Sequence, residues 1–176
     1  VGGVHRGSEL TGVISADLDA IASHPVITVS AGCKAFLDLQ RSLELLESAG
    51  APVRGWRHEC VPAFSSRSGG LPVPHRGEAA DEVARIFAAR SRPSSGVLLT
   101  VPIPEAAELD AAELDAVLND ALDDCERAGI VGAEITPFVL GRIAAATEGR
   151  SVPANLALAE NNAAVAAQVA VAVAAR

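Results

Sequence analysis

The sequence predicts an α/β protein with three layers, α/β/α, around a mixed, largely parallel sheet. Short segments rich in β-branched residues alternate with segments whose apolar residues recur every three or four positions. Of the 176 residues, 49% are hydrophobic, which is enough to bury one core of domain size. This alternation favours parallel strands that are covered by helices. We therefore expect residues 1–176 to form a single domain or the C-terminal portion of one.

Glycine and proline mark the ends of the elements expected in the first half. A short helical segment begins near Ser15 or Asp17, and Pro25 follows its end. Gly32 closes a run of β-branched residues that is typical of a buried strand. Gly50 ends a segment with helical spacing of apolar residues. The expected elements are a Gly-rich loop, a helix, a strand, a second helix and a second strand, at residues 1–12, 15–23, 25–32, 34–50 and 52–56.

The second half opens with a long segment rich in proline, serine and glycine, whose length is typical of a functional loop or lid. The clearest amphipathic helix follows later, where apolar residues from Leu114 to Cys125 keep the i, i+3, i+4 spacing and Gly129 ends the pattern. The expected elements are a loop, a helix, a strand and three further helices, at residues 60–78, 78–91, 95–104, 110–129, 134–149 and 152–176.

Composition excludes several classes of function. The net charge is -8 and no basic stripe alternates with aromatic residues, which argues against nucleic-acid binding. Three widely spaced cysteines without a CxxC pair argue against a disulfide framework and a structural zinc site, and they favour a reducing cytoplasm. The apolar tail at 163–175 is interrupted by Gln168 and is shorter than the roughly 20 residues of a membrane span. We expect a cytoplasmic protein that acts on small molecules.

Lys34 is the only lysine among 14 basic side chains. It follows the strand expected at 25–32 and opens the helix expected at 34–50, and the carboxyl ends of strands point into the ligand crevice of such sheets. A nearby helix N-terminus and apolar surroundings lower a lysine pKa, and a neutral lysine amine forms a Schiff base with an aldehyde. Arginine cannot do this because its guanidinium stays protonated. The alternative is a lysine left by chance on a surface turn of an arginine-biased sequence.

Six blocks of the sequence, in order, resemble pseudouridine-5'-phosphate glycosidases, a family that also includes the indigoidine-synthase-A-like proteins. The resemblance implies reversible cleavage of the C–C glycosidic bond of pseudouridine 5'-phosphate to uracil and ribose 5-phosphate. It also implies a homotrimer for the complete enzyme. The blocks are GGVHRGSELTGVISADL, VSAGCKAFLDLQRSLELLESAG, VPAFSSRSGG, TVPIP, EITPF and ANLALAENNA.

The resemblance also assigns roles to individual residues. It makes Lys34 the nucleophile that forms an imine with C1' of the ribose. The residues that it assigns to substrate are Ser15, Ala16 and Asp17 of the SAD segment, His5 on the phosphate side, and Asn155. A hydroxyl and backbone amides at a helix N-terminus suit a phosphate dianion.

Each of these residues also has a purely structural interpretation. Ser15 or Asp17 is a preferred residue type for a helix N-cap, and Asn155 is a candidate cap of the last helix. His5 is then a loop histidine that contacts no ligand.

The family pattern is broken in two places. The resemblance implies a manganese-binding Asp two positions before the SAD serine, but this chain has Val13, and an isopropyl group cannot coordinate a hard cation. The metal is then lost, held by other groups, or replaced by different chemistry. The family's general-acid glutamate and a second, substrate-binding lysine belong to an N-terminal half that precedes residue 1. We therefore expect a fragment, a processed chain, a split-gene product or a degenerate relative.

Three functions follow from these observations. The first is a glycosidase that acts on pseudouridine 5'-phosphate. The second is a C-ribosylating relative that joins ribose 5-phosphate to another aromatic acceptor, for which the stretch RGWRHEC would form a changed base pocket. The third is a non-catalytic subunit or remnant that binds a sugar phosphate.

Overall fold

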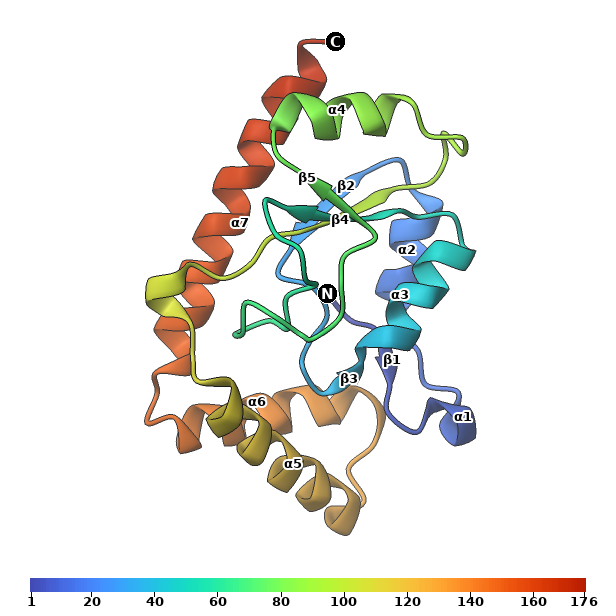
Figure 1. Cartoon of the computed structure of the whole chain (residues 1–176). Helices are drawn as coiled ribbons and strands as arrows, with labels where there is room; N and C mark the ends of the chain where they lie inside the picture. The colour runs from blue at the N-terminus through green and yellow to red at the C-terminus, as the bar shows by residue number, and fades with distance from the viewer.

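The computed structural model describes residues 1–132 and 134–176. Its centre is a four-stranded sheet in the order β2-β6-β4-β5, and all neighbouring strands are parallel (Figure 1). A separate antiparallel pair joins β1 to β3. The predicted α/β fold with a mostly parallel sheet is therefore confirmed. The strands are β1 Val4–His5, β2 Ile27–Ser30, β3 Leu37–Asp38, β4 Val53–Trp56, β5 His75–Gly77 and β6 Val97–Thr100.

Helices cover both faces of the sheet, as the three-layer prediction requires. On one face Leu98 of β6 packs with Leu18 of α2 and Leu46 of α3, and on the other Leu99 packs with Val83 of α4 and Val165 of α7. Successive residues of β6 thus point to opposite cores. The helices are α1 Ser8–Thr11, α2 Ala16–Ser23, α3 Leu39–Ser48, α4 Ala80–Ala88, α5 Ala111–Ala128, α6 Ile135–Ala146 and α7 Ser151–Ala174, with 3-10 turns η1 Glu105–Ala107 and η2 Gly132–Glu134.

A pair of helices, α5 and α6, closes the end of the molecule that faces the carboxyl ends of the strands (Figure 1). Leu118 and Val139 of this pair pack against Cys33 and Phe36, which follow β2. The loop after β2 is therefore held between the sheet and the α5–α6 pair. Asp110 caps α5, because its side chain accepts a hydrogen bond from the backbone N–H of Glu113 at 2.8 Å.

The helix predicted at 34–50 begins later than expected, at Leu39. Residues 31–36 form a loop, and Leu37–Asp38 pair with β1, where Val4 lies opposite Asp38. Asp38 then caps α3 by accepting a hydrogen bond from the N–H of Arg41 at 3.0 Å. The pairing with β1 is a contact distant in sequence, so local spacing did not reveal it.

The segment 60–78 was predicted as loop, and this is wrong at its end, where β5 forms the edge of the sheet. Its remainder is tied together by backbone hydrogen bonds, such as Gly69 N–H to the carbonyl of Val61 at 2.7 Å. A further bond, from the N–H of Phe64 to the carbonyl of Ala31, holds the segment against the chain that follows β2.

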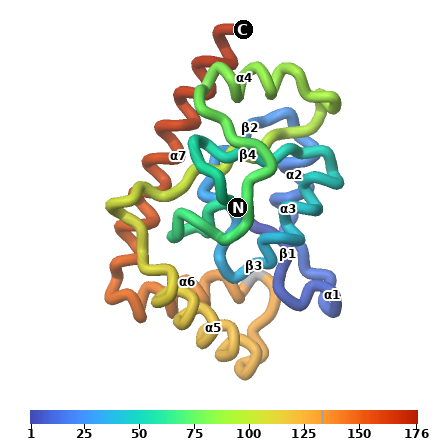
Figure 2. Tube along the Cα trace, in the orientation of Figure 1, coloured from blue at the N-terminus to red at the C-terminus, as the bar shows by residue number. Residues whose placement is uncertain are grey.

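Helix α7 is longer than the apolar tail read from the sequence. With 24 residues it is long and apolar enough to cross a membrane by length and composition, so the argument that the tail is too short was wrong. Figure 2 shows it running beside the sheet as far as α4, and Val165 and Val169 are buried in the core there. These contacts are those of a helix packed against a sheet.

Candidate functional site

The loop that carries Lys34 is fixed by its contacts with the segment after β4. The carbonyl of Ala31 accepts a hydrogen bond from the N–H of Phe64 at 3.1 Å. Gly32 has a φ of 79°, and a Cβ at this position would lie 2.3 Å from the carbonyl oxygen of Pro62. Only glycine fits both constraints. The position of Lys34 is therefore set where the segments that follow β2 and β4 meet.

The Lys34 side chain is half-buried. Its Nζ donates a hydrogen bond to Oγ1 of Thr136 on α6 at 3.5 Å and lies 6.0 Å from the centre of the Phe36 ring. The proposed help from a helix dipole is wrong, because α3 begins at Leu39 and the Asp38 carboxylate already occupies its N-terminus. The surroundings of the amine come instead from the α5–α6 pair and the loops.

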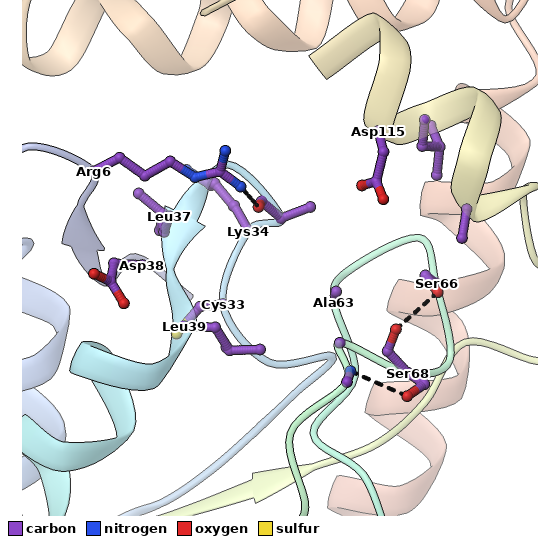
Figure 3. A pocket seen from close by; sticks show the side chains of 15 residues that line it. Arg6, Cys33, Lys34, Leu37, Asp38, Leu39, Ala63, Ser66, Ser68 and Asp115 are labelled. Atoms are coloured by element: carbon purple, nitrogen blue, oxygen red, sulfur yellow. Dashed lines mark hydrogen bonds between the residues drawn. The ribbon is translucent and has the colours of Figure 1, made fainter. Parts of the chain in front are cut away.

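Lys34 lines a cavity of about 630 Å³ at the carboxyl end of the sheet. Figure 3 shows the guanidinium of Arg6 pointing into it, with Asp115 of α5 on the opposite wall. Nη2 of Arg6 donates to the carbonyl of Ala35 at 3.2 Å, which orients the guanidinium. The hydroxyls of Ser66 and Ser68 form a further wall. A cation, a carboxylate and hydroxyls around one amine suit a phosphorylated sugar.

Sequence reasoning missed most of this wall. Arg6 stands next to His5 in a block that carried the resemblance, and Ser66 and Ser68 stand in another, so the signal was available. Asp115 lies among the polar residues of an amphipathic helix and has no local signature.

The SAD segment forms the start of α2. Ser15 is the N-cap, and its Oγ accepts a hydrogen bond from the N–H of Asp17 at 3.2 Å. The Asp17 carboxylate accepts instead from the N–H of Gly2 at 2.7 Å, and Ala16 is the first helical residue. A Cβ on Gly2 would lie 2.2 Å from Oγ of Ser15. The cap interpretation thus holds for Ser15, while Asp17 fixes the neighbouring chain segment.

Residues 1–3 pass between the SAD segment and the Lys34 loop. The nitrogen of Val1 donates to the carbonyl of Gly32 at 2.9 Å, while the next residue, Gly2, is bonded to Asp17. Ser15 and Asp17 therefore lie at the same end of the sheet as Lys34. Among the described residues that line the Lys34 cavity, neither of them occurs.

His5 lies in β1, where its N–H donates to the carbonyl of Val13 at 3.2 Å. Burial lowers the pKa of His5, and the positive charge of Lys34 lowers it further. His5 therefore lies within electrostatic reach of the lysine. Arg6, and not His5, faces the cavity.

Asn155 belongs to a neighbouring cavity of about 190 Å³. This cavity shares Phe64, Ser65 and Ile143 with a small apolar cavity that Lys34 also lines. Asn155 is the fifth residue of α7, so the interpretation as an N-cap is wrong. The structure places it beside the Lys34 region, behind the Phe64–Ser65 loop.

The residues present do not fit the manganese ion that the resemblance implies. Val13 has no oxygen in its side chain. Of the two acidic residues four positions away, Glu9 is ion-paired with Arg41 at 2.8 Å and Asp17 accepts a hydrogen bond from the N–H of Gly2. Within residues 1–132 and 134–176, no three His, Cys, Asp or Glu side chains gather as metal ligands. A hard cation prefers several oxygen ligands, which this set does not provide.

Comparisons with known proteins place the geometry in context. A family model described as "Indigoidine synthase A like protein" matches residues 1–172. The pseudouridine-5'-phosphate glycosidase of Methylobacterium nodulans is 48% identical over 98% of this chain and 52% of its own length. That of Sorangium cellulosum is 46% identical over 98% of this chain and 55% of its own length. The chain thus spans about half the length of the curated relatives it matches.

Two solved structures are similar over 99% of the chain. The crystal structure of the prealnumycin C-glycosynthase AlnA in complex with ribulose 5-phosphate has a TM-score of 0.92 and 36% identity, and 58% of that chain is covered. An indigoidine synthase A-like protein from Thermotoga maritima has a TM-score of 0.84 and 33% identity, and 57% of it is covered.

Proposed function

Because the chain belongs to the family of indigoidine synthase A like proteins, we propose that it forms the lysine-bearing part of a pseudouridine-5'-phosphate glycosidase. The reaction is the reversible cleavage of the C–C glycosidic bond to uracil and ribose 5-phosphate. One observation carries the proposal: the only lysine of the chain lines a cavity of about 630 Å³ that also holds an arginine and two serines. Relatives that cover the whole chain at 46–48% identity have this name.

The chemistry proceeds through an imine on Lys34. Its neutral amine attacks C1' of the sugar, the C1'–O4' bond breaks, and O4' takes a proton. The nitrogen lone pair then forms a C=N bond as the C1'–C5 bond breaks, and C5 of the departing uracil takes a proton. Water adds to the imine, and the amine leaves to release ribose 5-phosphate. The resemblance assigns the proton for uracil to a glutamate of the family's N-terminal half.

The cavity residues hold the sugar phosphate during these steps. Arg6 offers a guanidinium for the phosphate dianion, since planar N–H donors match phosphate oxygens in a bidentate manner. Asp115 accepts hydrogen bonds from sugar hydroxyls, and Thr136 orients the lysine amine. The resemblance implies substrate roles for Ser15, Ala16, Asp17, His5 and Asn155 as well, and these belong to the proposal although none of the five lines the cavity of about 630 Å³.

The cofactor, assembly and location belong to the same proposal. Position 13 supplies no ligand for manganese, because the valine side chain there has no oxygen atom. The complete protein is a homotrimer in the cytoplasm, and its partner is a small sugar phosphate.

A second function has one observation in its favour. The neighbour with a TM-score of 0.92 is named a C-glycosynthase and was crystallised with a pentulose phosphate. A C-ribosylating enzyme uses the same imine in the bond-forming direction with another acceptor. A non-catalytic sugar-phosphate subunit is the remaining candidate, because the chain spans about half the length of its relatives.

Borohydride trapping tests the proposal. The chain is incubated with ribose 5-phosphate, reduced, digested and analysed by mass spectrometry, with and without Mn²⁺. We expect one reduced adduct on the Lys34 peptide, and none on that peptide in K34R, which keeps the positive charge. An adduct confined to the amino group of Val1, or no adduct under either condition, contradicts both catalytic functions. In a protein that also contains the family's N-terminal half, uracil as the acceptor then gives pseudouridine 5'-phosphate if the first function is right, and no product if the second is right.

A further inference from the structure

A second large cavity, of about 500 Å³, lies at the end of the sheet opposite to Lys34. It opens between α3 and α4, at the amino ends of β4 and β5. Its wall is mostly apolar, and its polar groups are two arginines, a histidine, a glutamate and a serine. The lining side chains include Leu43, Ile86, Arg54, Arg90, Glu47 and His75.

In both arginines the Nε–H group lacks a hydrogen-bond acceptor among the described residues. The Nε atoms of Arg54 and Arg90 are buried and have no hydrogen-bond partner among the described residues. No ion pair of either arginine with an acidic side chain occurs in the described part of the chain. Burial of an unpaired polar group is costly, and more so for a charged one. The Nε atoms have no exposed surface and do not themselves line the cavity, but both guanidinium groups belong to its wall without an acidic partner, which favours an anionic ligand there.

Arg90 is held in place by its other atoms. Its guanidinium lies 3.6 Å from the centre of the Phe87 ring and donates to the carbonyls of Phe87 and Pro93. Burial lowers the pKa of Arg90 and of Arg54. The Arg90 guanidinium is thus held in a fixed orientation, while the Arg54 guanidinium is able to donate its terminal N–H groups to a carboxylate.

Two carboxylates lie near this pair of cations. Glu82 acts on Arg54 through its charge without forming an ion pair, and it accepts a hydrogen bond from the N–H of Glu78 at 2.8 Å. Glu47 lines the cavity and is exposed to solvent. His75 is also exposed. None of these groups reaches the buried Nε atoms, so the cations stay unmatched inside the cavity.

We propose that this cavity binds a small amphiphilic anion, with its carboxylate or phosphate on Arg54 and Arg90 and its apolar body against Leu43 and Ile86. A volume of about 500 Å³ is in the range of small-molecule sites, which are mostly apolar with a few placed polar groups. The site is separate from the Lys34 cavity, because β4 carries Arg54 at its amino end whereas Lys34 follows the carboxyl end of β2. Ligands at the two sites therefore do not compete directly.

Two ligands test this site: phenylacetate and its uncharged isostere phenylacetamide. Their binding to the 176-residue chain is measured by ligand-observed NMR and titration calorimetry. Phenyl phosphate forms a parallel arm that distinguishes phosphate from carboxylate. We expect phenylacetate to bind about tenfold or more tightly than phenylacetamide, because a hydrogen bond to a charged group contributes on that scale. R54M should lower the affinity for phenylacetate by about the same factor. R85M, which removes an exposed arginine of α4, is the matched control and should bind as the wild type does.

The outcomes are separable. R54M removes a half-buried guanidinium that forms no ion pair in the described part of the chain and keeps an unbranched apolar stem, so its melting temperature should stay close to that of the wild type. If R54M does not fold, the comparison of phenylacetate with phenylacetamide on the wild type decides alone. Saturating ribose 5-phosphate should not displace phenylacetate. Any one of four results would overturn the proposal. These are equal binding of the acid and the amide, equal binding by R54M and the wild type, no binding at millimolar concentrations, and displacement by ribose 5-phosphate.

Discussion

Replacing Gly32 by alanine should destabilise the chain and slow the chemistry of Lys34. The backbone at this glycine has a φ of 79°, which costs an L-residue roughly 1–2 kcal/mol. The new Cβ would also lie 2.3 Å from the carbonyl oxygen of Pro62, well inside van der Waals contact. Relief of such overpacking by backbone movement costs about 1–3 kcal/mol more. We therefore expect Gly32→Ala to lower the free energy of unfolding by about 2–5 kcal/mol.

Gly129→Ala is the matched control for this experiment. Gly129 caps α5 with a φ of 66°, and nothing lies within 4 Å of a Cβ built there. The free energy of unfolding of Gly129→Ala should fall only by what the left-handed backbone conformation costs an L-residue, about 1–2 kcal/mol. For a chain of this size 1 kcal/mol corresponds to roughly 2–4 °C in melting temperature. The difference between the two variants measures the contact with Pro62 by itself.

Two assays read out the result. Thermal and urea unfolding, followed by circular dichroism, give the stability of each variant. Borohydride trapping gives the rate of adduct formation, which should fall in Gly32→Ala because the displaced Pro62 segment also lines the Lys34 cavity through Ala63. Equal destabilisation of the two variants, together with an unchanged trapping rate in Gly32→Ala, would refute the reasoning.

Three further predictions concern titration and metal binding. The pKa of His5, followed by NMR, should lie below about 6.5 and rise in Lys34→Met without reaching that value, because burial is the larger cause; an unchanged value would contradict this. Burial raises the pKa of the Cys33 thiol, so stability that is present below the unfolded value of about 8.5 should be lost as pH rises above it. The chain has no Tyr and one Lys, so neither residue type adds much to titration in this pH range. Cys33→Ala should therefore reduce the loss of unfolding free energy at alkaline pH, measured by urea unfolding at several pH values. An unchanged dependence of this free energy on pH would count against the prediction. Val13→Asp should bind Mn²⁺ more tightly than the wild type by electron paramagnetic resonance, and equal affinity would show that position 13 is irrelevant.

The elements that the sequence revealed are those with local signals. β2 and β6 are runs of β-branched or apolar residues bounded by glycine or proline, and α5 has a regular apolar stripe with Gly129 at its end. The cap at Ser15 was also visible, because serine before a helical segment is a local feature. In each case the information lies within a few residues of the element.

The parts that were missed depend on contacts distant in sequence. β5 has no strand pattern in His75–Gly77 and exists because β4 offers a free edge for pairing. The late start of α3 results from the pairing of Val4 with Asp38. The carboxylate of Asp115 enters the candidate site because α5 packs over the loop after β2. Spacing along the chain contains no signal for such contacts.

The reactivity of Lys34 must therefore be explained without the helix dipole that the sequence suggested. α3 begins five residues after the lysine, and Asp38 satisfies its first amides. Gly32 packs on the Pro62 carbonyl and Ala31 is bonded to Phe64, so the lysine is positioned by the junction of the segments after β2 and β4. A rigid junction that half-buries one amine beside a large cavity is a means of pre-organisation, and its benefit depends on geometry more than on charge. It follows that variants of the junction should reduce imine formation even where Lys34 itself is unchanged.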